Sequence, residues 1–497
     1  MSRNPIAPRA PRGLLAVVLT LLASAALLLG ACGGGSTTSA AGSTAVPTTA
    51  PAYTATLALS PEHAKPGATI TVTGSKYPAG ASVDLVWHSV KGHYELTGGT
   101  EFVGARFDDT SKVLTTVKAD AAGNISTQIT MPGNDFGGEH DVRGRVNGTE
   151  ISQAALTMDP VVTMTPGSGA IGAPITLTIE GVDWRSTIDT WHVLYDNKYL
   201  GFMSAVTTQG TAVAHFRAAG PVGMHEVSVW HNSYYPTPYL NWQQGPNKSI
   251  PDFDFAFNVT ADPGASAPVV EDFTATDNPW PTNLKTPGTL TLTPDRGTVG
   301  ATTTIKGSGL PANADLSLRY YTEVGNRVTP SGFSEQAVEL GTVHTDASGT
   351  FSKATTIPAD LGGQHLYEVY QGSTVLAAAN LVIEPSVLSV SATSVKVGQT
   401  ITIHLKGVGW TTYDNTYAVT YDDSYIGYVC GFSTAGDISF KITATGGAGT
   451  HIIDLYPTIY KGQDAKPNVY SIPQLTYQTD HPQRLTPAIR LSIEVTN

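Results

Sequence analysis

A chain of 497 residues is too long for one hydrophobic core, and its length predicts three or four domains. The composition is 41% hydrophobic and 14% charged, with 51 glycines and 32 prolines, which favours a turn-rich all-β protein over a helical or disordered one. The formal charge of −12, without a visible cluster of lysine and arginine, argues against nucleic acid as a partner, because phosphate binding needs such clusters.

The first 31 residues have the pattern of an export signal. Three arginines precede an apolar run at residues 14–29, and small residues follow. The sequence Leu29-Gly30-Ala31-Cys32 at the end of this run resembles the lipobox of bacterial lipoproteins. That resemblance implies that residues 1–31 are removed and that Cys32 carries lipid on the extracytoplasmic face of the cell membrane. The alternative is an ordinary secretory signal with an incidental cysteine.

Residues 32–55 form an uncharged tract of glycine, serine, threonine, alanine and proline. Such a tract cannot bury a core, so we expect a flexible tether that lifts the folded part off the membrane. If Cys32 carries lipid, the second cysteine, Cys430, has no partner within the chain. The exported protein must then rely on its hydrophobic cores rather than on a disulfide.

The first folded domain, domain A, is predicted at residues 56–160. Apolar and polar residues alternate at Ile70 and Val72, and again at Val83, Leu85 and Trp87. A period of two predicts half-buried strands, and Pro-Gly and Pro-Ala-Gly motifs supply the turns between them. Seven or so short strands in about 100 residues predict a sandwich of two antiparallel sheets.

Domain B, predicted at residues 161–261, has the same organisation, with a long insertion at 231–251 before its last strand. Residues 262–288 are rich in proline and turn-forming residues and lack a sustained alternation, so we interpret them as a linker. The alternative for this segment is an extra edge strand at Pro268–Phe273.

The second half of the chain repeats the first. Segment 181–202 returns 226 residues later as 407–428 with nine of its 22 residues identical, far above chance. The repeat predicts domain A′ at 289–385 and domain B′ at 386–497, the latter with a longer insertion at 457–487. We therefore expect an all-β chain of four immunoglobulin-like sandwiches in the order A-B-A′-B′. Each A domain should pack on its B domain, and cleavage of the linker should release two folded halves.

Short turn motifs recur in all four domains. Domain A carries PGATITVTGSKYPAG, DAAGN and GGEH, domain A′ carries GSGLPAN, and the B domains carry GVDW and GVGW. These motifs are similar to the immunoglobulin-like modules of bacterial surface proteins, of the IPT/TIG-like kind, in which an aromatic residue sits between turn glycines. Trp184 and Trp410 match that position, whereas domain A′ has Leu310 there. The resemblance implies a surface lipoprotein of tandem modules that act as spacers, adhesive units or carbohydrate-associated accessories.

No catalytic or cofactor-binding motif is found, neither a nucleophile elbow nor a P-loop, a zinc-binding HExxH or a dinucleotide fingerprint. We therefore expect no catalytic residue, no cofactor and no metal. One histidine occupies the same place in each repeat: His140, His225, His365 and His451. Histidines in four separate sandwiches cannot converge on one ion, so we interpret them as structural.

Acidic residues occupy the same hairpin turn in both B domains, as Asp196-Asn197 and Asp422-Asp423. Short polar side chains in such turns usually cap backbone groups. Calcium is the alternative, although each turn offers only one or two carboxylates.

Aromatic residues give the strongest indication of function. Rings that follow the strand alternation, such as Trp191 and Tyr417, are predicted to fill the cores. Seven aromatic residues lie in the B and B′ insertions instead and are the candidate ligand-binding residues: Tyr234, Tyr235, Tyr239, Trp242, Tyr460, Tyr470 and Tyr477. A loop of this length is either functional or folded back as a cover over its own or a neighbouring domain. Both interpretations remain open.

The expected function is that of a lipid-anchored cell-surface protein acting in adhesion, scaffolding or ligand display. The alternative is a carbohydrate-binding surface protein that uses the aromatic loops of the B domains, and an enzyme is a third class. The expected partners are the membrane, through lipid on Cys32, and a surface glycan or another surface protein.

Overall fold

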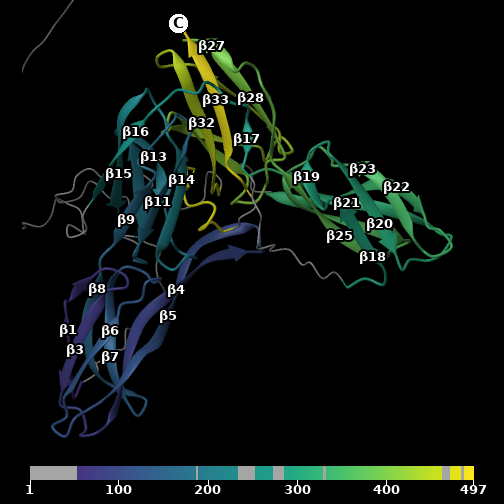
Figure 1. Cartoon of the computed structure of the whole chain (residues 1–497). Coiled ribbons are helices and arrows are strands. Elements are labelled where there is room, and N and C mark those ends of the chain that lie inside the picture. The colour runs from purple at the N-terminus through teal and green to yellow at the C-terminus, as the bar shows by residue number, and fades with distance from the viewer. Residues whose placement is uncertain are drawn as a thin grey trace, which may run out of the picture. The chain divides into compact units, whose positions relative to one another are not determined.

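The computed structural model describes residues 53–185, 189–232, 252–271, 285–327, 332–461, 471–482 and 486–497. The predicted signal peptide, Cys32 and most of the tether lie outside these ranges. Residues from Ala52 onward form one compact unit. Every regular element in the described ranges is a β-strand (Figure 1), and none of these ranges holds a helix that could cross a membrane.

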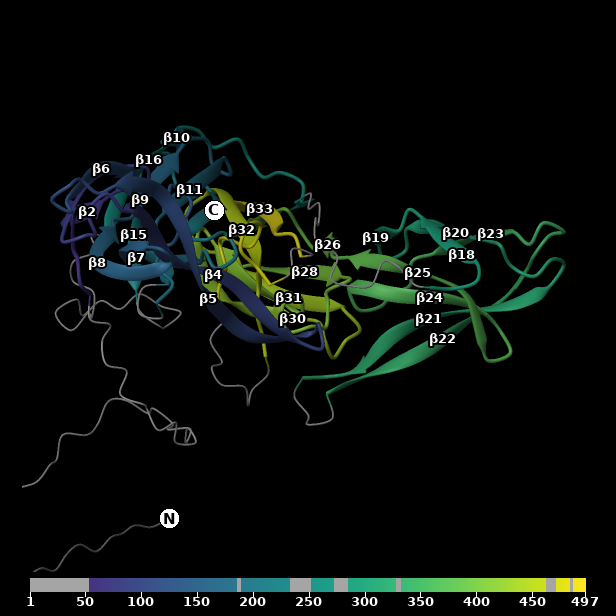
Figure 2. The ribbon, with the colours of Figure 1, turned by 90° about the horizontal axis from the view of Figure 1, so that it is seen from below.

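The described residues form eight sheets, which pair into four sandwiches. Each sandwich has one sheet of three strands and one sheet of five or six strands. The three-stranded sheet of domain A contains β1 (Thr56–Ser60), β3 (Thr69–Ser75) and β6 (Ile125–Thr130). Its larger sheet has the order β2 (His63–Ala64), β8 (Thr149–Met158), β7 (Gly138–Val146), β4 (Ser82–Thr97) and β5 (Glu101–Lys118). The hairpin of β4 and β5 is the longest in the described chain and is seen as a twisted ribbon in Figure 2.

Domain B repeats this plan. Its smaller sheet has the order β14 (Thr211–Arg217), β11 (Pro174–Glu180) and β9 (Val161–Thr165). Its larger sheet has the order β10 (Ser168–Gly169), β16 (Phe253–Val259), β15 (Gly223–Asn232), β12 (Thr190–Tyr195) and β13 (Lys198–Met203).

Domains A′ and B′ follow the same order of strands. In A′ the smaller sheet contains β18 (Thr289–Thr293), β20 (Thr302–Ser308) and β23 (Phe351–Thr356). The larger one contains β19 (Arg296–Thr298), β25 (Thr374–Glu384), β24 (Gly363–Gln371), β21 (Asp315–Gly325) and β22 (Phe333–His344). In B′ the smaller sheet contains β26 (Ser386–Val390), β28 (Thr400–Lys406) and β31 (Ile438–Thr443). The larger one contains β33 (Ile489–Thr496), β32 (Gly449–Thr458), β29 (Thr416–Tyr421) and β30 (Ser424–Cys430), with β27 (Ser394–Lys396) and β17 (Val269–Val270) both paired to β33.

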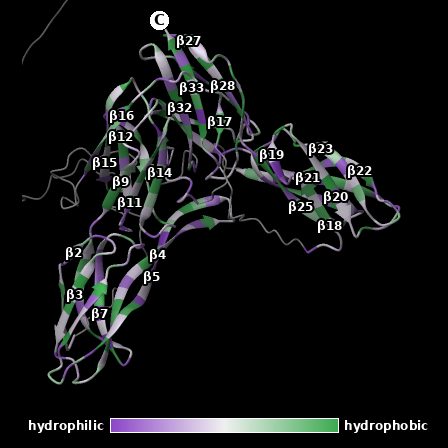
Figure 3. Cartoon of the chain, in the orientation of Figure 1, coloured by the Kyte–Doolittle hydropathy of each residue, from purple (hydrophilic) through white to green (hydrophobic). Residues whose placement is uncertain are grey.

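The predicted alternation places the cores between the sheets. On β11, Ile175, Leu177 and Ile179 are buried while the residues between them are more accessible, and hydropathy colours alternate along many strands in Figure 3. The predicted core rings Trp191 and Tyr417 are both buried. The fold class expected from the sequence, tandem immunoglobulin-like sandwiches, is therefore confirmed.

The described part of the predicted linker is not a free connection. Strand β17 pairs with β33, so the alternative interpretation, an edge strand, holds at Val269–Val270. Beside it, the Ser266 amide donates to Ser492 Oγ at 2.7 Å, and the Asp262 carboxylate accepts from the Thr450 amide at 2.9 Å. Residues 262–271 thus lie along domain B′, because polar groups of the segment find partners there.

Candidate functional site

Two of the seven predicted binding aromatics are described, and both are buried. The Tyr460 ring stacks on Phe432 with ring centroids 5.8 Å apart. Tyr477 is 1% exposed, and its hydroxyl donates to Glu271 and accepts from Arg490. Neither ring is free to stack on a sugar, because both are buried.

For these two residues burial favours the cover, one of the two interpretations that the sequence left open. The other five candidates lie outside the described residues, and their role stays a prediction: Tyr234, Tyr235, Tyr239, Trp242 and Tyr470.

The cover formed by segment 471–482 joins domain B′ to domain B. The Phe202 amide of β13 donates to the Pro473 carbonyl at 2.9 Å, and the Leu475 amide donates back to the Phe202 carbonyl at 2.8 Å. Residues of B′ complete the hydrophobic core of B, namely Ile452, Tyr456, Leu475, Tyr477 and Ala488. A core shared by two domains resists separation, because parting them would expose buried apolar surface to water.

A buried cluster of charges lies at this B–B′ joint. Arg217 of β14 donates to the Asp454 carboxylate of β32 and, at 2.7 Å, to the Leu491 carbonyl. Arg490 of β33 lies 2.9 Å from Asp454 and donates to Glu271 at 2.7 Å. Burial opposes the charge of Arg490, yet the Asp454 and Glu271 carboxylates hold the pKa of its guanidinium above its ordinary value. Asp454 therefore pairs with two arginines, one from each domain.

Asp480 ties together three domains. Its buried carboxylate accepts hydrogen bonds from the Val206 amide at 2.9 Å and the Thr207 amide at 2.8 Å, both of domain B. It also accepts one from the Tyr94 hydroxyl of the β4–β5 hairpin of domain A at 2.9 Å. Charge-assisted hydrogen bonds of this kind are among the stronger polar contacts in proteins.

The hairpin of domain A reaches domain B′ at a second place. The Phe102 amide donates to Thr412 Oγ1 at 2.6 Å, and the Thr412 amide donates to the Thr100 carbonyl at 3.1 Å. Phe102 also shares a small apolar cluster with Tyr413 and Ile459 of B′. The hairpin is thus fixed by both backbone and side-chain contacts.

The A–B and A′–B′ joints are copies of one another. The Gly137 amide donates to the Val182 carbonyl at 3.0 Å, and Gly362 makes the same bond to Val408 at 2.9 Å. A Cβ atom on Gly137 would lie 1.8 Å from the Gly181 carbonyl oxygen, so only glycine permits this approach. Each A domain therefore packs on its own B domain.

The two turn tryptophans serve these joints. Trp184 meets Phe136 of domain A edge to face at 6.1 Å, and Trp410 meets Phe333 of domain A′ at 5.2 Å. They are packing residues, and their partners belong to the neighbouring domain.

The four repeated histidines are held by hydrogen bonds. In each, Nε2 bonds to the carbonyl four residues earlier, as His225 does to Pro221 at 2.7 Å. In the B domains Nδ1 bonds to the hairpin-turn aspartate, which raises the pKa of His451 through Asp422. These contacts show the predicted structural role. In the part of the chain that the structure describes, no group of three His, Cys, Asp or Glu side chains could hold a metal.

Asp423 is the unusual member of the B′ hairpin turn. It is buried, and neither of its carboxylate oxygens has a hydrogen-bond partner among the described residues. Burial raises its pKa well above the ordinary value, Asp454 and Asp422 add to the effect, and Arg217 and Arg490 oppose it. A buried carboxyl without a partner stays protonated because ionisation would cost solvation.

We expect Asp423→Asn, which copies Asn197 of domain B, to stabilise the protein at neutral and alkaline pH. A raised folded-state pKa means that the stability tied to this proton is fully present below the unfolded pKa of about 3.9 and is lost as pH rises toward the folded pKa, by about 1.4 kcal/mol per pH unit. Urea unfolding of both proteins between pH 4 and 9 measures the difference. The curves should meet at pH 4 and diverge above it, and parallel curves would contradict the account.

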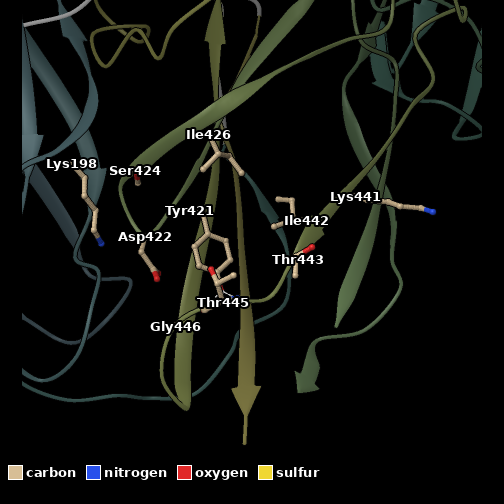
Figure 4. A pocket seen from close by; sticks show the side chains of 10 residues that line it. All are labelled: Lys198, Tyr421, Asp422, Ser424, Ile426, Lys441, Ile442, Thr443, Thr445 and Gly446. Carbon is tan, nitrogen blue, oxygen red and sulfur yellow. Dashed lines mark hydrogen bonds between the residues drawn. The ribbon is translucent and has the colours of Figure 1, made fainter. Parts of the chain in front are cut away.

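An open hollow of about 480 Å³ lies along domain B′ beside its hairpin turn (Figure 4). Lys198 reaches it from domain B, and Ser424, Thr443 and Thr445 offer hydroxyls. Lys441 points away from the other side chains in this view. Polar side chains line this hollow, but they do not point toward one common place in it.

Sequence reasoning missed the residues at the joints, although one signal was present. Asp454 is a charged residue within the apolar run HIIDLYPT. A charge in a strand that is apolar on both faces indicates that a partner covers the second face.

No protein-family model matches the chain, and no curated protein matches it. Among solved structures it is similar to a Salmonella alpha-2-macroglobulin reacted with methylamine, with 7% identity and a TM-score of 0.18 over 87% of this chain and 30% of that one. The chain thus spans under a third of the length of that protein.

Two other solved structures are similar over more of their own length. One is a tetra-tandem repeat from the extending region of a large adhesion protein, with 12% identity and a TM-score of 0.19 over 84% of this chain and 97% of that one. The other is a putative membrane-anchored protein from Corynebacterium diphtheriae, with 15% identity and a TM-score of 0.18 over 66% and 89%. With TM-scores this low, the fold assignment rests on the sheets described above.

Proposed function

We propose that this protein is a lipid-anchored, extracytoplasmic scaffold of the bacterial surface, without enzymatic activity, that supports adhesion through four fixed β-sandwiches. The observation that carries the proposal is the set of joints between domains. Asp480 by itself contacts both A and B from B′, and residues of B′ complete the hydrophobic core of B. Contacts of this extent favour a stiff scaffold over independently moving domains, because opening the B–B′ joint would expose buried apolar surface to water.

The alternative, carbohydrate binding by the B-domain insertions, receives less support. Two of its seven aromatic residues, Tyr460 and Tyr477, are used for packing between or within domains. The scaffold function does not depend on the remaining five.

Cys32→Ala is expected to abolish lipid attachment, so that the protein is released from cells or left unprocessed. One acyl chain binds a membrane only marginally, whereas the several chains of a lipoprotein hold it stably. Cells labelled with a fatty-acid analogue should incorporate it into the wild-type chain and not into the variant. Cys430→Ser is the control and should label like the wild type. Equal labelling of the Cys32 variant would contradict the anchor.

The adhesive role is tested in the producing bacterium with this gene deleted. Deleted cells should attach less to surfaces or to neighbouring cells, wild-type protein should restore attachment, and the Cys32→Ala protein should not. Unchanged attachment of the deleted cells would overturn the adhesive role.

A further inference from the structure

A hollow of about 460 Å³ lies where domains A, A′ and B′ meet. Its lining comes from the start of β5, from the end of the β21–β22 hairpin and from the B′ segments around Trp410 and Lys461. This size lies within the range of small-ligand sites in proteins. The hollow is separate from the B–B′ joint.

Arg327 fixes the walls of the hollow relative to one another. Its side chain is 7% exposed and donates to Glu101 of domain A at 2.8 Å and to the Trp410 carbonyl of B′ at 2.9 Å. The guanidinium also lies 5.4 Å from the Phe333 ring centre. A buried side chain with partners in two other domains holds the hollow in shape before any ligand arrives.

Two aromatic rings form one wall. Trp410 and Phe333 are each half-buried, and their rings meet at an angle of 53°. Rings that are partly accessible in a hollow offer an apolar face to a ligand. A pyranose ring carries C–H groups on its faces and hydroxyls on its rim, so it can use such a wall.

A pair of carboxylates without partners lies on the opposite strands. Glu323 and Glu335 are directly paired across β21 and β22, where like charges are destabilising. Neither carboxylate has a hydrogen-bond or ion-pair partner among the described residues, and both line the hollow. Burial, and then Glu335, raises the pKa of Glu323 to about 7, so the pair can share a proton and both accept and donate hydrogen bonds.

Hydrogen-bond donors complete the lining of the hollow. Lys461 lies 5.8 Å from the Phe102 ring centre, and burial lowers the pKa of its ammonium. Because Lys461 and Arg327 already bring two positive charges, the three carboxylates do not create a strongly acidic hollow that would select a cation. Mixed donors and acceptors beside aromatic rings match a neutral ligand rich in hydroxyl groups.

From this lining we infer that the hollow binds a saccharide. One sugar ring packs against Trp410 and Phe333, Glu323 and Glu335 accept hydrogen bonds from its hydroxyls, and Lys461 donates to it. The inference deepens the proposed adhesive function and rests on it for its biological setting. It places sugar recognition at the three-domain joint rather than on the seven aromatic residues of the B-domain insertions.

The test uses the purified full chain and two probe sets. The first is a glycan array with soluble oligosaccharides of glucose, N-acetylglucosamine, mannose and galactose, followed by titration calorimetry up to about 10 mM, where weak sites are still measurable. The second set contains the organic cations choline and spermidine. Trp410→Ala and Glu335→Gln remove one wall and one acceptor. Trp184→Ala, the repeat counterpart of Trp410 that packs on domain A, and Glu62→Gln, an exposed glutamate, are the matched controls.

We expect at least one saccharide to bind, and Trp410→Ala and Glu335→Gln each to weaken it about tenfold or more, with both controls unchanged. Because Trp410→Ala could loosen the joint, Glu335→Gln on an exposed strand position provides the second, fold-preserving variant. Absence of saccharide binding, binding of the cations alone, or saccharide binding that Glu335→Gln leaves unchanged would each overturn the inference. None of these results would affect the surface scaffold, which the Cys32 and deletion experiments test.

Discussion

Replacing Asp454 by serine, the residue at the equivalent position 228 of domain B, is expected to lower the free energy of unfolding by about 3–5 kcal/mol. Asp454 is fully buried and is the shared carboxylate of Arg217 and Arg490. Serine leaves both guanidinium groups buried without that charge. Removing one partner of a buried ion pair is costly for this reason, even where the intact pair contributes little.

Urea unfolding followed by tryptophan fluorescence measures this effect. Asp437→Asn is the control, because Asp437 pairs with Lys406 at the surface and such pairs contribute at most about 1 kcal/mol. A loss for Asp454→Ser no larger than that of the control would show that the arginines find other partners and that the cluster does not hold the joint.

Asp480→Ala is expected to have a comparable effect, about 3–5 kcal/mol, and to loosen domain A from the rest. The substitution removes the carboxylate that accepts hydrogen bonds from the Val206 and Thr207 amides and from the Tyr94 hydroxyl. Each buried donor that loses its partner costs about 1–3 kcal/mol. The loss should appear both in urea unfolding and as faster hydrogen exchange at the tip of the β4–β5 hairpin.

Asp108→Ala, on the exposed part of β5, is the control for Asp480→Ala. Its side chain is 72% exposed, and surface changes of this kind are usually within about 0.5 kcal/mol. Unchanged exchange at Tyr94 in the Asp480 variant would contradict a role for this carboxylate in joining the domains.

The sandwiches could be predicted from the sequence because their cause is local. Alternation at Ile175, Leu177 and Ile179 places these residues on one face of a strand, and burial of that face follows. The repeated turn Asp422-Asp423 was also visible, and both residues have the positive φ that a two-residue hairpin turn requires.

The joints could not be predicted because their cause is not local. Strand β32 is apolar on both faces, with Ile453 and Leu455 on its inner face and Ile452 and Tyr456 on its outer face. The pattern indicates that something covers the outer face, but it does not identify domain B as the cover. Arg217 and Asp454 meet across 237 residues of chain.

The position of the B′ insertion also could not be predicted from the local sequence pattern. Tyr477 lies outside any strand alternation, which is why it was a candidate ligand-binding residue. Its ring is buried because the segment folds onto domain B. Its hydroxyl meets Glu271 of the linker and Arg490 of its own domain. Loop composition alone does not distinguish an exposed ring that binds a ligand from a ring that packs against the protein itself.

The central claim is that the two halves of the chain form one assembly through the B–B′ joint, and cleavage between them tests it most directly. A protease site inserted between Glu271 and Lys285 cuts the chain after the segment that lies along B′. After complete cleavage without denaturant, both fragments should elute together at the mass of the intact protein and separate only in urea. Elution of two folded halves at their individual masses would contradict the joint and restore the picture of two independent A–B pairs.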